Sequence, residues 1–215
     1  MKKYLSVSAL LITWLMVSPA WAAVEIAPDT LVDNTAQEVL SIIRQDKDIR
    51  AGNTGKILNL VEAKVLPHFN FTRMTRLSMG KNWNMATPDQ QQELVKEFRT
   101  LLVRTYSNAL ASYRDHQIKV EPARIKPGDT DVTVKTQVME DHGQAPVPID
   151  YSMEKSANSW KVYDVTVAGV SLVTNYRGSF NTQIRDGGVS KLLKTLQDKN
   201  RSLEAKDKEN KTAAN

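Results

Sequence analysis

The 215-residue sequence predicts an α+β fold in which helices precede and follow one twisted antiparallel sheet. Apolar side chains recur with a helical period up to about residue 113, alternate with polar ones over residues 118–168, and become helical again from residue 171. Short turn sequences separate the alternating segments, which is typical of a meander of hairpins. Helices and strands that are segregated along the chain favour the α+β class.

Four helices are expected ahead of the sheet, over residues 29–52, 54–67, 70–80 and 87–113. The fourth helix has the clearest start. Thr87 offers a capping hydroxyl, Pro88 suits the first helical position, and Gln90 completes a capping box. A wide apolar stripe along this helix makes it the expected spine of the fold.

Four strands are expected in the sheet, over residues 118–120, 132–138, 147–154 and 160–168. Pro148 in the third strand indicates an edge position or a bulge, because proline cannot donate to the ladder. The fourth strand carries Trp160 on one face and Tyr163 on the other. It is therefore expected to be covered on both faces or to contain a bulge.

Both ends of the chain are expected to lie outside the folded domain. Residues 1–22 begin with basic residues, continue with an apolar run too short to cross a bilayer, and end with the small-x-small site Ala20-Trp21-Ala22. This combination indicates a cleaved signal peptide, and an uncleaved anchor is the alternative. The domain is expected over residues 23–199, and its last helix begins at Ser171 and is interrupted by Gly187-Gly188. Residues 200–215 are nearly all polar, so a disordered tail is expected.

Composition excludes several kinds of chemistry. The chain has no cysteine, which excludes disulfides, thiolate metal sites and a cysteine nucleophile. The three histidines, His68, His116 and His142, are scattered, and His68 is expected to be a partly buried structural residue rather than a ligand. No complete nucleophile or phosphate-loop motif is present. The net charge of the whole chain is +5, and removal of Lys2 and Lys3 with the signal peptide would leave +3, which is too weak to favour nucleic acid. We therefore expect neither an enzyme nor a bound cofactor or metal.

The apolar faces of the expected helices and strands are extensive. Their spacing is compatible with a filled core and equally with the wall of a cavity, and periodicity alone leaves both interpretations open. A resemblance to a known family favours the second.

Three segments, taken together, resemble the MlaC family, also called the toluene-tolerance auxiliary family. They are Val65-Leu66-Pro67-His68-Phe69, residues 86–113 from Ala86-Thr87-Pro88-Asp89-Gln90-Gln91 through Phe98-Arg99, and residues 160–180 with Trp160-Lys161-Val162-Tyr163-Asp164-Val165 and Gly169-Val170-Ser171-Leu172. The resemblance covers the chain from about residue 29 to residue 200.

The resemblance implies a soluble periplasmic carrier of diacyl glycerophospholipids. Such carriers shuttle lipid between an outer-membrane lipoprotein–porin complex and an inner-membrane ABC transporter complex with an MCE-domain ring, and the system maintains outer-membrane lipid asymmetry. The implied fold is related to the nuclear transport factor 2-like folds, with acyl tails in an apolar cavity between sheet and helices. A monomer is expected.

The cavity wall is assigned by periodicity on three surfaces that the resemblance brings together: the long helix, the short helix before it, and one face of the sheet. The lipid-binding residues assigned in this way are Phe71, Met74, Leu77, Leu94, Phe98, Leu101, Leu102, Tyr106, Val138, Val147, Ile149, Tyr151, Met153, Val165 and Val167. Arg73, Arg76 and Arg177 are assigned, more weakly, to the rim near the headgroup.

Two other functions stay open. The cavity could carry another apolar ligand, such as a hopanoid or an organic solvent, in which case the mass of the bound ligand would differ. The scaffold could also belong to a periplasmic enzyme related to nuclear transport factor 2, although no histidine falls on an expected cavity-facing position.

Overall fold

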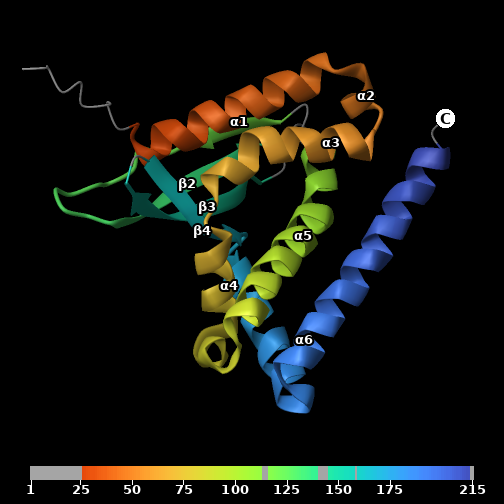
Figure 1. Ribbon diagram of the computed structural model, residues 1–215. Coiled ribbons are helices and arrows are strands. Elements are labelled where there is room, and N and C mark those ends of the chain that lie inside the picture. The colour runs from red at the N-terminus through yellow and green to blue at the C-terminus, as the bar shows by residue number, and fades with distance from the viewer. Residues whose placement is uncertain (1–25, 113–115, 140–144, 158, 214–215) are drawn as a thin grey trace, which may run out of the picture.

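Helix α1 (Pro28–Gln45) crosses one side of the sheet, and helices α4 to α6 pack together beyond it in the computed structural model (Figure 1). The structure describes residues 26–112, 116–139, 145–157 and 159–213. The expected signal peptide at 1–22, the expected helix end at Tyr113 and the expected turn at Asp141-His142-Gly143 lie outside the described residues. Within the described ranges, no helix is both long and apolar enough to cross a membrane.

The helices before the sheet follow the predicted order. They are α1, α2 (Lys47–Arg50), α3 (Thr54–Leu60), α4 (Phe71–Met79) and α5 (Pro88–Ser112), joined by a π-helical turn η1 (Val61–Val65) and two 3₁₀ turns, η2 (Leu66–His68) and η3 (Gly80–Met85). The predicted capping box opens α5: the Gln90 N–H donates to Thr87 Oγ1 over 3.2 Å, and the Thr87 N–H donates to Gln90 Oε1 over 3.0 Å.

The sheet is antiparallel throughout, with five strands in the order β1-β2-β3-β4-β5. They are β1 (Gln117–Val120), β2 (Asp131–Met139), β3 (Val147–Ser156), β4 (Ser159–Val167) and β5 (Val170–Ser171). Four strands were expected, and the two-residue β5 is too short to carry an alternating pattern. It forms because Ala168 (φ 48°) and Gly169 (φ 83°) make a tight turn that folds the chain back on β4.

The register of β3 and β4 resolves the two expectations about bulges. Ser152 pairs with Asp164 and Met153 pairs with Val162, so Tyr163 is the extra residue of a bulge in β4. Pro148 lies instead near the start of β3, an internal strand, and opposite Gln137, so it marks neither an edge strand nor this bulge.

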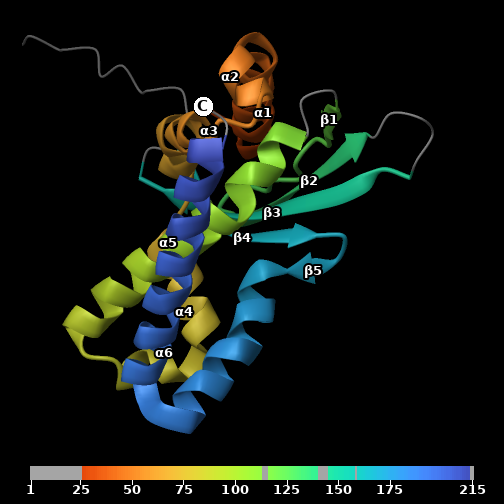
Figure 2. The same ribbon diagram turned by 90° about the vertical axis from the view of Figure 1, so that its right-hand side faces the viewer.

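Helix α6 (Leu172–Ala213) consists of two segments, residues 172–186 and 189–213, that double back on each other at Gly187-Gly188 (Figure 2). The second segment runs beside α5 and continues through residues 200–213, where a disordered tail was expected. Three side chains, each about one turn from the next, explain the difference because all three contact the rest of the fold. Asn200 donates a hydrogen bond to Glu97, Leu203 packs on the apolar cluster between α4, α5 and α6, and Asp207 pairs with Arg104 over 2.5 Å.

Among the residues that the structure describes, buried apolar side chains form three clusters. The largest lies between α4, α5 and α6 and includes Met79, Phe98, Phe180 and Leu192. The second lies between α1 and the sheet, and the third lies between α1 and α3. The bulge places Trp160, Val162 and Val165 in the second cluster and turns Tyr163 toward the first. The sheet therefore has an apolar layer on each face.

Candidate functional site

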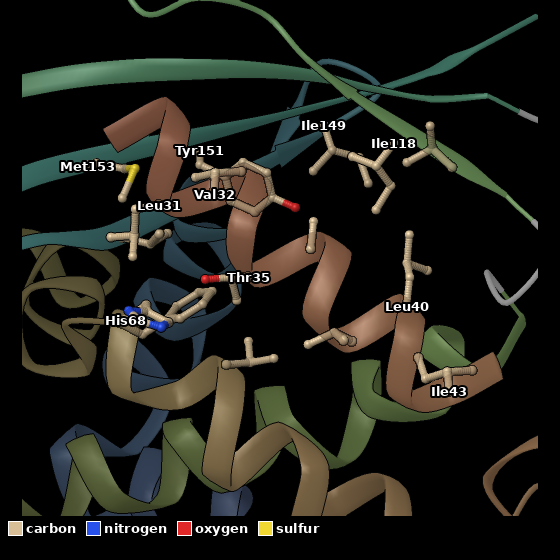
Figure 3. A pocket seen from close by; sticks show the side chains of 16 residues that line it. Leu31, Val32, Thr35, Leu40, Ile43, His68, Ile118, Ile149, Tyr151 and Met153 are labelled. Atoms are coloured by element: carbon tan, nitrogen blue, oxygen red, sulfur yellow. The ribbon is translucent and has the colours of Figure 1, made fainter. Parts of the chain in front are cut away.

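A cavity of about 160 Å³ lies between α1 and the sheet (Figure 3). Seven of its lining residues come from α1, where the spacing of one and three residues between successive members keeps them on one helical face. These seven are Leu31, Val32, Thr35, Ala36, Val39, Leu40 and Ile43. The sheet supplies the opposite wall with Ile118, Val138, Ile149, Tyr151, Met153 and Val162. Val65, His68 and Phe69 line it from the segment before α4.

The wall is almost entirely apolar. Thr35, His68 and Tyr151 are its polar side chains, and the Tyr151 hydroxyl points into the cavity in Figure 3. An apolar space with a few polar groups is typical of a small-molecule binding site. Among the residues that the structure describes, no group of three or more histidine or acidic side chains is placed to hold a metal ion.

His68 lies half-buried in this wall, and its surroundings disfavour the imidazolium. Burial lowers the pKa of His68 below its ordinary value of 6.5, the positive charge of Lys161 lowers it further, and the negative charge of Glu38 opposes both effects. The imidazole is therefore neutral at pH 7.

The segment that carries His68 is fixed to both walls of the cavity. The Asn70 N–H donates to the Val162 carbonyl over 2.8 Å, and the Lys161 ammonium donates to the Pro67 carbonyl. On the other side, Lys64 pairs with Glu38 of α1 over 2.5 Å. The sheet, the loop and α1 therefore meet at this end of the cavity.

Helix α1 is held to the β1 flank of the sheet at both of its ends. The Ala123 N–H donates to Asp29 Oδ2 over 3.0 Å, and Arg44 Nη2 donates to the His116 carbonyl over 3.0 Å. Between these two hydrogen bonds, the inner face of α1 meets the sheet through apolar side chains. Glu38, in the same middle section, pairs with Lys64 of η1, so α1 has polar links at both ends and one along its length.

The structure places four of the sequence-assigned residues in the cavity wall: Val138, Ile149, Tyr151 and Met153. The assigned residues of α4 and α5 lie elsewhere. Met74, Leu94, Phe98, Leu101 and Leu102 are buried in the cluster between α4, α5 and α6, and Phe71 and Leu77 pack against that cluster.

The remaining assignments lie outside the wall of this cavity. Val165 packs on the cluster between α1 and the sheet, Val147 and Val167 pair within the sheet, and Tyr106 is 41% exposed on α5. Tyr106 hydrogen-bonds to Tyr176, whose pKa burial raises far above its ordinary value, with a smaller contribution from Tyr106. The Tyr176 hydroxyl is therefore neutral at any physiological pH.

None of the three arginines assigned to the rim lines the cavity, and two of them bind elsewhere in the fold. Arg73 pairs with Asp131 over 2.6 Å and with Glu154 over 2.5 Å. Arg177 Nε donates to the Leu77 carbonyl over 2.9 Å, and Arg76 lies exposed on α4.

The cavity residues that sequence reasoning missed are the α1 face, Val65, His68 and Phe69 of the segment before α4, and Ile118 and Val162 of the sheet. The α1 stripe is visible in the sequence as a helical repeat of apolar residues, but periodicity does not reveal which surface the stripe faces. His68 and Phe69 follow Pro67 in a region without any repeat, so only the fold brings them to the cavity.

Comparisons with known proteins agree on one family. The family model described as MlaC protein matches residues 33–198. The intermembrane phospholipid transport system binding protein MlaC of Haemophilus influenzae is 23% identical over 92% of each chain. Toluene tolerance protein ttg2D of Pseudomonas putida is 26% identical over 75% of this chain and 74% of that protein.

A solved structure also matches this fold. The phospholipid-binding protein from Ralstonia solanacearum, in complex with a phospholipid, superposes with a TM-score of 0.76 at 38% sequence identity. The match covers 83% of this chain and 99% of the other. With a family model that spans most of the chain and a solved relative of the same fold, this protein belongs to the MlaC family.

Proposed function

We propose that this protein is a periplasmic carrier that binds a diacyl glycerophospholipid and shuttles it between membrane complexes of an intermembrane lipid transport system. The observation that carries the proposal is the apolar cavity between α1 and the sheet, in a chain whose solved relative holds a phospholipid. The chain belongs to the MlaC family, and its Haemophilus influenzae relative is named as the binding protein of an intermembrane phospholipid transport system, which supports the transport role.

The physical requirement of a carrier matches this cavity. Each acyl methylene that leaves water contributes about 0.8 kcal/mol, so a carrier needs apolar wall more than it needs polar contacts. Small-molecule pockets are typically about 300–1,000 Å³. Because the cavity here is about 160 Å³, two acyl tails require its walls to separate. The contacts that such a separation would strain are the two end hydrogen bonds of α1 and the Lys64–Glu38 ion pair.

The proposed partners are those of the family system: an inner-membrane MCE-domain protein of an ABC transporter complex and an outer-membrane lipoprotein–porin complex. Transfer through a passive cavity is reversible, so the direction of net transport must come from the ATP-using partner. The proposed outcome for the cell is maintenance of outer-membrane lipid asymmetry, and the carrier is proposed to act as a monomer without a cofactor.

Native mass spectrometry of the mature chain, purified from the periplasm, tests the proposal. We expect a mass excess equal to one diacyl phospholipid, which solvent extraction and fragmentation then identify. A hopanoid or an organic solvent in its place would identify a carrier of another ligand. Release of fatty acid or lysophospholipid during incubation would instead indicate an enzyme, and a protein that stays free of lipid after incubation with phospholipid vesicles would contradict the proposal.

A further inference from the structure

We propose that His68 is the phosphate-recognising residue of the cavity, and that the headgroup of the bound lipid lies at the His68 end while the tails extend toward Ile43 and Ile118. This inference rests on the proposed function and adds the orientation of the ligand and a determinant of its specificity. It begins from the position of the polar groups, because a long apolar cavity by itself admits a lipid in either direction.

The two ends of the cavity differ in polarity. Figure 3 shows His68 at one end, and Leu40, Ile43 and Ile118 toward the other. The imidazole is the one ring in the wall that can change from a neutral group to a cation near physiological pH. A phosphodiester needs donors and positive charge, and an acyl tail needs neither.

Charge around His68 is positive on balance. Lys161 on β4 carries its ammonium to the Pro67 carbonyl beside His68, and Lys64 of η1 lies across from Glu38 of α1. Lys161 and Glu38 are the charged groups that shift the pKa of His68. Glu38 is itself paired with Lys64. None of these three groups lines the cavity, but together they leave one net positive charge beside the segment that carries His68, and this charge favours an anion at that end.

His68 is also held in place before any ligand arrives. The 3₁₀ turn Leu66–His68 is closed by the Phe69 N–H, which donates to the Leu66 carbonyl over 3.1 Å. The backbone N–H of Asn70 donates to the carbonyl of Val162 on β4, the residue after Lys161. A recognition residue on a fixed segment loses little conformational entropy when it binds.

Proton uptake follows from this placement. Burial and Lys161 keep the pKa of His68 below 6.5 in the cavity, and a phosphate anion in contact would raise that pKa by stabilising the imidazolium. Because the bound state then holds a proton that the free state lacks, affinity for the phospholipid increases as the pH falls from 8 toward about 6. A lipid without a phosphate should show no such dependence.

The opposite end of the cavity offers a matched control. Arg44 lies next to the lining residue Ile43 and donates to the His116 carbonyl, two residues before the lining residue Ile118. If the headgroup lay at that end, Arg44 would be its charged partner. The two orientations therefore make opposite predictions for variants of His68 and Arg44.

The experiment compares dioleoyl-phosphatidylglycerol with dioleoylglycerol, which has the same tails and no phosphate. Delipidated mature protein takes up each lipid from detergent at pH 6 and pH 8, and native mass spectrometry measures the bound fraction. The wild type should prefer the phospholipid by about tenfold at pH 6, the ratio expected of one charge-assisted hydrogen bond. His68→Phe and His68→Gln should both remove the preference and its pH dependence, each measured relative to that variant's own dioleoylglycerol uptake. Arg44→Gln should retain both.

The outcomes separate this inference from the proposed function. If the wild type takes up neither lipid, the proposed function fails. If it takes up both lipids equally, or if the His68 variants retain the preference while Arg44→Gln loses it, only the orientation fails. Titration with inorganic phosphate, followed through the His68 imidazole signals in NMR, supplies the last arm. Saturation by free phosphate in the absence of lipid would assign a general anion site and overturn the headgroup assignment.

Discussion

Asn200 and Glu97 face each other inside the α5–α6 interface, where Asn200 Nδ2 donates to the Glu97 carboxylate over 2.7 Å and to the Glu97 carbonyl over 2.9 Å. Both side chains are buried. Buried polar groups that have found partners are costly to separate, because the remaining group loses its hydrogen bond without regaining water. This pair therefore anchors the C-terminal part of α6.

Asn200→Ala should lower the free energy of unfolding by about 1–3 kcal/mol, because it removes the amide donor of the buried Glu97 carboxylate. Urea denaturation followed by circular dichroism measures the change. Lys199→Ala, one residue earlier and exposed, should remain within about 0.5 kcal/mol of the wild type. Equal stability of the two variants would contradict the anchoring role of Asn200.

Arg73 links α4 to two strands and gives the fold a dependence on pH. Its guanidinium pairs with Asp131 and Glu154 and lies 3.7 Å from the centroid of the Tyr163 ring. At Asp131, burial acts to raise the pKa, but the hydrogen bond and the charge of Arg73 outweigh it and hold the pKa below its ordinary value of 3.8. The pairing therefore stabilises the fold above pH 3.8 and is lost as the pH falls below it.

Arg73→Met should destabilise the protein by about 1–2 kcal/mol at pH 7, a figure moderated by the partial exposure of the ion pairs. The difference from the wild type should shrink at pH 3, below the ordinary pKa of Asp131, because the unfolded chain takes up a proton there and the folded pair loses its advantage. Urea denaturation of the wild type and of Arg73→Met at pH 7 and pH 3 measures the difference in stability. Arg76→Met, on the exposed side of the same helix, is the control and should have little effect on stability at either pH. If Arg73→Met destabilised the protein as much at pH 3 as at pH 7, Asp131 would be excluded as the partner responsible.

Local signals in the sequence were sufficient for the order of the elements and for the best-defined helix start. The reciprocal hydrogen bonds of Thr87 and Gln90 involve residues three apart, so their geometry is encoded locally. The alternating apolar residues of β2 and β3 likewise predict their pairing as a hairpin.

The partner of each apolar face is not encoded locally. The stripe of α5 that includes Phe98 and Leu101 is covered by Leu192 and Leu196, because the chain reverses at Gly187-Gly188 and returns along α5. The face of α1 that includes Ala36 and Leu40 meets the cavity instead. Both stripes have the same period, so a sequence pattern cannot distinguish the filled interface from the one with space in it.

The reversal within α6 depends on a conformation that only glycine adopts easily. Gly188 has φ 71° and ψ −175°, outside the regions that side chains allow. Gly188→Ala should therefore cost about 1–3 kcal/mol. Gly178→Ala, in the regular first segment of α6 where a Cβ meets no atom within 4 Å, should instead stabilise the protein by about 0.5–1 kcal/mol.

Thermal and urea unfolding of the two glycine variants give the comparison directly. Because both substitutions add the same methyl group to the same helix, opposite signs would isolate the backbone conformation as the cause. A destabilised Gly188→Ala variant should also weaken the contacts between the two segments of α6, such as the hydrogen bond from Thr195 to Gln183. Identical effects at both positions would refute the requirement for glycine at the reversal.

The position of the ligand between α1 and the sheet can be tested by filling the cavity. Ala36 lines the cavity from the middle of α1 and is partly exposed, so a larger side chain there can enter the free space without displacing the buried core. Ala36→Trp should reduce the fraction of lipid-loaded protein in native mass spectra more than tenfold, because the indole occupies the volume that an acyl tail needs.

Gln37→Trp places the same side chain on the exposed face of α1 one residue later and should retain the full lipid load. Unchanged melting temperatures of both variants would show that the fold tolerates the added ring, so that a loss of lipid reflects the cavity alone. A folded Ala36→Trp protein with full occupancy would place the tails elsewhere. The α5 face around Leu101 would then be the next wall to test, although it can accept a tail only if α6 first moves away from it.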